Sequence, residues 1–126
     1  MKKKFGTALN CIDGRTQIPV IKWLKENFGV DYVDLITEPG MDKVLAEGQW
    51  DEIERLREKA IISIEAHNSN VIAVVGHYDC AANPVSDLKH FRDIVASTYT
   101  VVSWGLPVKV VGLWVDDFWR VHVVSI

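Results

Sequence analysis

The amino-acid sequence predicts an α/β fold with three layers, in which helices cover both faces of a mainly parallel central sheet. The run at residues 71–75 is apolar without a break and mostly β-branched, as in a strand that is buried on both faces of a parallel sheet. Segments of this kind alternate along the chain with segments whose apolar residues recur at helical spacing. Strands that alternate with helices are typical of a parallel sheet in an α/β protein.

Composition limits the class of protein. The 126 residues are predicted to form one domain, residues 1–126, which is large enough to bury a core without disulfides. The net charge of -3 argues against nucleic acid as a partner, because binding its backbone needs a basic face. No segment approaches the roughly 18 apolar residues of a membrane-spanning helix. The apolar run after the N-terminal lysines is too short for a signal peptide, so a cytoplasmic protein with reduced thiols is predicted.

The first half of the chain predicts a strand, a helix and a second strand. Residues 5–11 form the first strand, which ends in a loop. Thr16 can cap the following helix, whose apolar stripe runs until Gly29 ends it. The second strand covers residues 32–36, and the turn signal Glu-Pro-Gly at residues 38–40 closes it.

The middle of the chain predicts three helices around the central strand. A short helix at residues 41–47 precedes a glycine. Residues 51–67 are the clearest helix, with an acidic first turn that suits the helix dipole and apolar residues at helical spacing. Polar residues 68–70 end it and lead into the central strand, and a further helix covers residues 86–99.

Two strands complete the predicted sheet. Residues 108–115 form a buried strand. Residues 119–125 form the last one, with polar and apolar side chains on alternate faces. That alternation is typical of an edge strand or of a strand that faces a partner.

Unusual residues follow two of the predicted strands. Cys11, Asp13 and Arg15 follow the first strand, and His77 and Cys80 follow the central one. Ligands gather at the carboxyl ends of strands in open α/β sheets, so neighbouring strands would bring Cys11 to His77 and Cys80. Two thiolates and one imidazole suit Zn²⁺, and three protein ligands leave a fourth position for water or substrate. Such a site supplies a metal-bound hydroxide at neutral pH.

Asp13 and Arg15 lie on alternate positions of one loop and could pair. The pair would hold Asp13 ionised, so that it accepts a hydrogen bond from the metal-bound water. It would also keep the carboxylate away from the fourth metal position. An ordinary loop ion pair is the alternative interpretation.

The two loops together resemble a known pair of motifs. Cys-Ile-Asp-Gly-Arg at residues 11–15 and Gly-His-Tyr-Asp-Cys at residues 76–80 are similar to the Cys-x-Asp-x-Arg and His-x-x-Cys motifs of the β-class carbonic anhydrases. The order of predicted elements is also similar over about residues 5–114. The resemblance implies a β-carbonic-anhydrase-like fold, a homodimer or higher oligomer, and a lyase that hydrates carbon dioxide reversibly to bicarbonate. It implies zinc on Cys11, His77 and Cys80, with Asp13 and Arg15 as the catalytic pair.

Two departures from that family keep other functions open. Ala81 stands where the family usually has glycine, and residues 37–41 read Thr-Glu-Pro-Gly-Met in place of a segment like Arg-Asn-Ala-Gly-Asn. The same site could instead hydrolyse carbonyl sulfide or carbon disulfide. A non-catalytic zinc module, closed by Asp13 as fourth ligand, is a second alternative. A thiol redox sensor that uses Cys11 and Cys80 is a third.

The remaining polar residues are predicted to have structural roles. Asp79 is predicted to cap the turn that follows it, and the Asp-Asp pair at residues 116–117 to lie in a solvated turn. Glu38 follows a strand end, but a structural role is favoured for it. The other histidines are predicted to be surface or structural residues: His67, His90 and His122.

Overall fold

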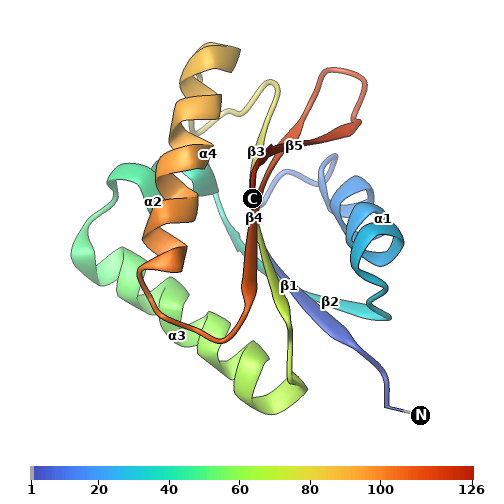
Figure 1. The fold of residues 1–126 in the computed structure, drawn as a ribbon. Coiled ribbons are helices and arrows are strands. Elements are labelled where there is room, and N and C mark those ends of the chain that lie inside the picture. Colours follow the sequence, from blue (N-terminus) through green and yellow to red (C-terminus); the bar gives the residue numbers. More distant parts are fainter. Residues whose placement is uncertain (1) are drawn as a thin grey trace.

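The computed structural model describes residues 2–126 and contains one five-stranded sheet with the strand order β2-β1-β3-β4-β5 (Figure 1). The first four strands are parallel to their neighbours, and the last one is antiparallel to β4. The α/β fold with a mainly parallel sheet is therefore confirmed. The strands are β1 (Phe5–Cys11), β2 (Tyr32–Glu38), β3 (Val71–His77), β4 (Lys109–Val115) and β5 (Val121–Ser125).

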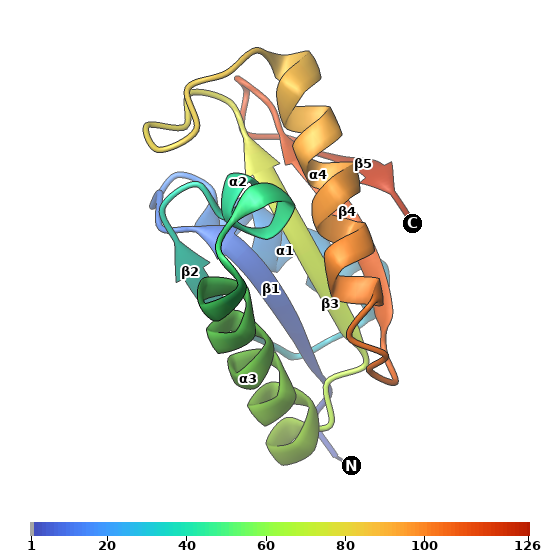
Figure 2. The same ribbon diagram turned by 90° about the vertical axis from the view of Figure 1, so that its left-hand side faces the viewer.

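Helices cover both faces of this sheet and make the three layers that the sequence predicts. Helix α1 lies alone on one face, and the other three helices lie on the opposite face (Figures 1 and 2). The helices are α1 (Gln17–Phe28), α2 (Met41–Glu47), α3 (Trp50–His67) and α4 (Asp87–Val102). Within residues 2–126, no helix combines the length and the apolar character needed to span a membrane.

Strand β3 is buried along its whole length because it has helices on both sides. Its side chains alternate between two cores, as the pleat of a strand requires. Val71, Ala73 and Val75 pack toward α1, whereas Ile72 and Val74 pack toward α2, α3 and α4. The unbroken apolar run of the sequence is thus explained by burial on both faces.

Several elements are longer than predicted, and in the two strands the added residues pair with a neighbouring strand. Strand β2 continues to Glu38, which lies in register with Cys11 of β1. Strand β3 continues to His77, which pairs with Val115 of β4. Helix α4 continues to Val102, three residues beyond the predicted end.

Two predicted element starts and one predicted helix cap are corrected. Thr16 occupies the N-cap position of α1 but makes no side-chain cap, because its hydroxyl donates to the Asp13 carbonyl oxygen over 2.8 Å. Helix α3 begins at Trp50, where Gln49 and Glu52 form a capping box. Strand β5 begins at Val121 and not at residue 119, because Trp119 has a φ of 60° and lies in the turn after β4.

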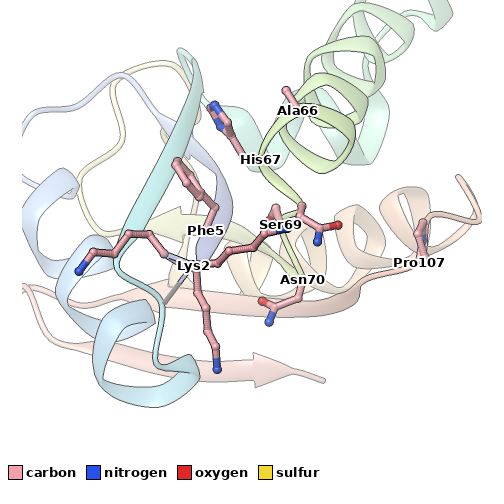
Figure 3. Close-up of a pocket in the computed structure, with 10 residues that line it drawn as sticks. Lys2, Phe5, Ala66, His67, Ser69, Asn70 and Pro107 are labelled. Carbon is pink, nitrogen blue, oxygen red and sulfur yellow. The ribbon is translucent and has the colours of Figure 1, made fainter.

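A surface hollow of about 630 Å³ lies at the amino ends of β1 and β3 (Figure 3). Lys2, Phe5 and His67 are among the residues that line it. The His67 ring stacks on Phe5, with the ring centroids 4.2 Å apart. This hollow is at the opposite end of the sheet from the residues that the sequence predicts as ligands.

Candidate metal site

The three predicted ligands come together at the carboxyl ends of β1 and β3. Cys11 is the last residue of β1, His77 is the last residue of β3, and Cys80 lies in the turn that follows. These two strands are parallel neighbours in the sheet. One possible ligand atom from each of the three residues lies within 4.8 Å of the others, and all three residues are buried. Strand order therefore brings together residues that are far apart in the sequence.

His77 is held with one ring nitrogen free for a ligand. Its Nδ1 lies 2.7 Å from the carbonyl oxygen of Tyr78, and since a carbonyl oxygen can only accept, Nδ1 donates. In the neutral ring the other nitrogen, Nε2, then carries a lone pair. It is buried and has no hydrogen-bond partner within residues 2–126. A metal ligand has this arrangement, because the second nitrogen of a ligating histidine is normally fixed by an acceptor.

The two cysteine thiols lie in one cluster and shift each other's ionisation in opposite directions. The neighbouring Cys80 thiol lowers the pKa of Cys11 far below its ordinary value. The Cys11 sulfur, together with burial, raises the pKa of Cys80. Burial lowers the pKa of His77, but the neighbouring Cys11 sulfur and the Tyr78 carbonyl outweigh that effect and raise it. Two thiols and an imidazole in contact are a donor set that fits Zn²⁺.

Asp13 and Arg15 form a two-point ion pair beside this cluster. Arg15 Nε donates to Asp13 Oδ1 over 3.0 Å, and Arg15 Nη2 donates to Oδ2 over 2.7 Å. The hydrogen bonds from the guanidinium lower the pKa of Asp13 to about 2. The set of ligand atoms found in residues 2–126 includes no oxygen of Asp13 or of Glu38. Asp13 is thus held by Arg15 and not by the cluster.

Arg15 is also held from its other side by residues that the sequence did not indicate. Arg15 Nη1 lies 3.3 Å from Asp79 Oδ2, and Nη2 donates to the Asp79 carbonyl oxygen over 3.2 Å. The guanidinium lies over the Trp119 ring, 4.6 Å from its centroid. The predicted turn cap at Asp79 is therefore wrong, since its carboxylate pairs with Arg15. The left-handed turn at Trp119 places its ring there.

The other predicted surface or structural residues lie outside the ligand cluster. His67 and His122 are exposed and pair with Asp34 and Asp116 over 2.7 and 2.6 Å. Asp116 lies in the turn between β4 and β5, where it accepts hydrogen bonds from the backbone. His90 is buried and pairs with an aspartate, which makes it structural.

Replacing Arg15 with glutamine is expected to raise the pKa of Asp13 from about 2 toward its ordinary value of 3.8. Glutamine keeps a donor but removes the positive charge that favours the carboxylate. Because the folded-state pKa is depressed, the pair contributes stability above about pH 4 and loses it as the pH falls toward 2. The check is a carboxyl-carbon NMR titration of both proteins.

Arg57→Gln is the matched control, because Arg57 pairs with Glu54 on α3. This variant should leave the pKa of Asp13 unchanged. An Asp13 pKa that stays near 2 in Arg15→Gln would contradict the assignment of its cause.

Comparisons with known proteins are consistent with this geometry. A family model described as "Putative carbonic anhydrase" matches residues 1–125. The fold is similar to that of a β-carbonic anhydrase, isoform I, from the protozoan Trichomonas vaginalis, with a TM-score of 0.63, 17% identity, and coverage of 98% of this chain and 84% of that one. It is also similar to a carbonic anhydrase from Glaciozyma antarctica, with a TM-score of 0.65, 12% identity, and coverage of 99% and 85%. A comparison with curated proteins found no match.

Proposed function

Because the chain belongs to the carbonic anhydrase family and has the fold of the β-carbonic anhydrases, we propose that it is a zinc-dependent lyase that hydrates carbon dioxide reversibly to bicarbonate. The observation that carries the proposal is the cluster of Cys11, His77 and Cys80, with ligand atoms within 4.8 Å of one another. The unpartnered Nε2 of His77 supports it further. Residues 1–126 would act as one zinc domain.

The ligand number favours a catalytic site over a closed structural one. Cys11, His77 and Cys80 would hold zinc, and three protein ligands are typical of catalytic zinc sites, whereas structural sites have four. Bound zinc supplies hydroxide at neutral pH, since coordination lowers the pKa of water to about 7. The two-point ion pair of Arg15 with Asp13 supports this choice, because each Asp13 oxygen already accepts a hydrogen bond from the guanidinium.

Asp13 and Arg15 would position the attacking group. The low pKa of Asp13 keeps its carboxylate ionised at neutral pH, so it can only accept hydrogen bonds. It would accept one from the attacking hydroxide and so orient a lone pair toward the carbon of carbon dioxide. Arg15 fixes the plane of the carboxylate, and Asp79 and Trp119 fix Arg15. These residues would supply orientation and leave the covalent step to the hydroxide.

Apolar side chains beside the ligands suggest that a second copy covers the site. Ile12, next to Cys11, is 57% exposed, and Tyr78, next to His77, is 44% exposed. Phe118, next to Trp119, is 74% exposed. Exposed apolar side chains are a feature of interfaces, so we propose that the chain forms a homodimer or higher oligomer. The need for two reduced thiols favours the cytoplasm.

The direct test is stopped-flow hydration of carbon dioxide by fully zinc-loaded protein between pH 7 and 9. The expected result is turnover well above the rate of buffer and of the zinc-free chain. Carbonyl sulfide and carbon disulfide belong in the same panel, with hydrogen sulfide as the readout. Turnover of carbonyl sulfide or carbon disulfide without turnover of carbon dioxide would favour the alternative hydrolase function. No turnover of any substrate by protein with a full zinc complement would favour a non-catalytic zinc-binding module.

A further inference from the structure

Two buried carboxylates lie behind the turn that carries Cys80. Asp42 in α2 is 1% exposed, and Asp93 in α4 is 3% exposed. Burying a carboxylate is costly unless its oxygens receive hydrogen bonds or a charged partner. Neither residue has a part in the proposed reaction. Their contacts therefore indicate what this arrangement does.

Asn83 connects both carboxylates to the Cys80 turn. Its Nδ2 donates to Asp42 Oδ1 over 3.1 Å and to Asp93 Oδ2 over 3.0 Å. Its backbone N–H lies 3.3 Å from the carbonyl oxygen of Cys80, to which it donates. The side chain is buried, so water does not compete for these bonds. One amide thus attaches the turn to α2 and α4 together.

The carboxylates are themselves fixed to the helices, independently of the turn. Asp42 Oδ2 lies 2.6 Å from His90 Nδ1, and Asp42 Oδ1 accepts from the Lys43 backbone N–H over 3.0 Å. Asp93 Oδ1 accepts a hydrogen bond from Lys89 Nζ. Each carboxylate therefore has a partner on the helices besides Asn83. Together they form a hydrogen-bonded frame to which the turn is attached.

The same frame contacts the strand that carries the histidine ligand. A Cβ atom added to Gly76 would lie 2.7 Å from Asp42 Oδ2. The Asp42 carboxylate is therefore packed against the backbone immediately before His77. One buried group touches the His77 strand directly and the Cys80 turn through Asn83. Asp42 therefore lies between the two segments that carry His77 and Cys80.

We propose that Asp42, Asn83 and Asp93, here called the carboxylate clamp, position Cys80 against Cys11 and His77 and so set the affinity of the site for zinc. The clamp residues are positioning residues that act through the backbone of the turn. This inference rests on the proposed function, because it takes the cluster as a zinc site. Outer partners of metal ligands typically change metal affinity by about 10- to 100-fold when they are replaced.

Asn83→Asp is the sharpest variant, because it replaces a two-hydrogen donor with an acceptor that faces two carboxylates. Its dissociation constant for zinc, measured by competition with a chromogenic chelator, is expected to rise about 10- to 100-fold. The cobalt-substituted protein should also show weaker thiolate-to-cobalt charge-transfer absorption, as Cys80 leaves its position. Asn83→Ala, which removes the donors without adding charge, should shift both readouts in the same direction. If Asn83→Asp does not fold, the zinc affinity and the cobalt spectrum of Asn83→Ala test the proposal.

Ser63→Ala separates positioning from general stability. Ser63 is buried and bonds to Thr7 and Asp34, both over 2.7 Å, at the amino end of the sheet. Removing it should weaken the fold but leave the zinc affinity and the cobalt spectrum as in the wild type. Equal losses of zinc affinity in Ser63→Ala and Asn83→Ala, at equal losses of stability, would overturn the clamp, as would unchanged readouts in both Asn83 variants. A wild-type chain that takes up no zinc would instead overturn the proposed function and the clamp with it.

Discussion

Replacing Cys80 with serine is expected to remove most of the zinc from a chain that otherwise carries about one ion. A serine hydroxyl stays protonated where a thiol ionises, so it is a poor zinc ligand. Only Cys11 and His77 then remain of the buried set. The affinity should fall by more than the roughly 100-fold that loss of an outer partner can cause. The measurement is elemental analysis of zinc per chain, on protein purified without a metal-affinity tag.

Ala81→Ser is the control for this experiment, because it puts a serine in the same turn at an exposed position. It should retain the zinc content of the wild type. Full zinc in Cys80→Ser would show that the metal is held elsewhere. The thiol redox sensor would be favoured if the wild-type chain does not bind added zinc and if Cys11 and Cys80 form a reversible disulfide.

Asp13→Asn is expected to lower kcat for carbon dioxide hydration by about 100-fold, the lower end of the range for a positioned acid–base group. The neutral amide has lost the charge that pairs with Arg15 at two points. It can also present hydrogens where the carboxylate accepted them. Zinc content should not change, because Asp13 contributes no oxygen to the ligand cluster within residues 2–126. Stopped-flow kinetics with parallel zinc analysis measure both quantities.

Asp117→Asn makes the same chemical change in the exposed turn after β4 and should leave kcat unaltered. An Asp13→Asn enzyme with wild-type kcat would remove Asp13 from the proposed reaction. Loss of zinc from that variant would point to the closed site, with Asp13 as a ligand.

Patterns that depend on nearby residues predicted the fold well. The apolar run of β3 and the apolar periodicity of α3 were sufficient to predict these two elements. A strand that is buried on both faces, or a helix that is buried along one stripe, shows a characteristic pattern of apolar residues over a short stretch of sequence. The grouping of Cys11, His77 and Cys80 followed from one further rule, that the ends of neighbouring parallel strands meet. Cys11 and His77 belong to such neighbours.

Contacts between distant segments could not be predicted in this way. Asp79 pairs with Arg15 across 64 positions, and no local spacing encodes that contact. The hydrogen bond between Asn83 and Asp42 in the carboxylate clamp spans 41 positions. Asparagine is common in turns, so the sequence around Asn83 does not indicate this contact. The cap at Thr16 failed for a local reason, because the Asp13 carbonyl competed for its hydroxyl. Side-chain partners of this kind need the assembled fold.

The strand order has a consequence for the sequence of events in biosynthesis. Strand β1 is made first, but its neighbour β3 follows only after α1, β2, α2 and α3 have been synthesised. Cys11 therefore emerges from the ribosome long before His77 and Cys80, which lie beside it in the folded chain. Contacts so distant along the chain are closed late in folding, because the entropy of loop closure must first be overcome. A metal ion that needs all three donors would therefore find them together only after β1 and β3 have paired.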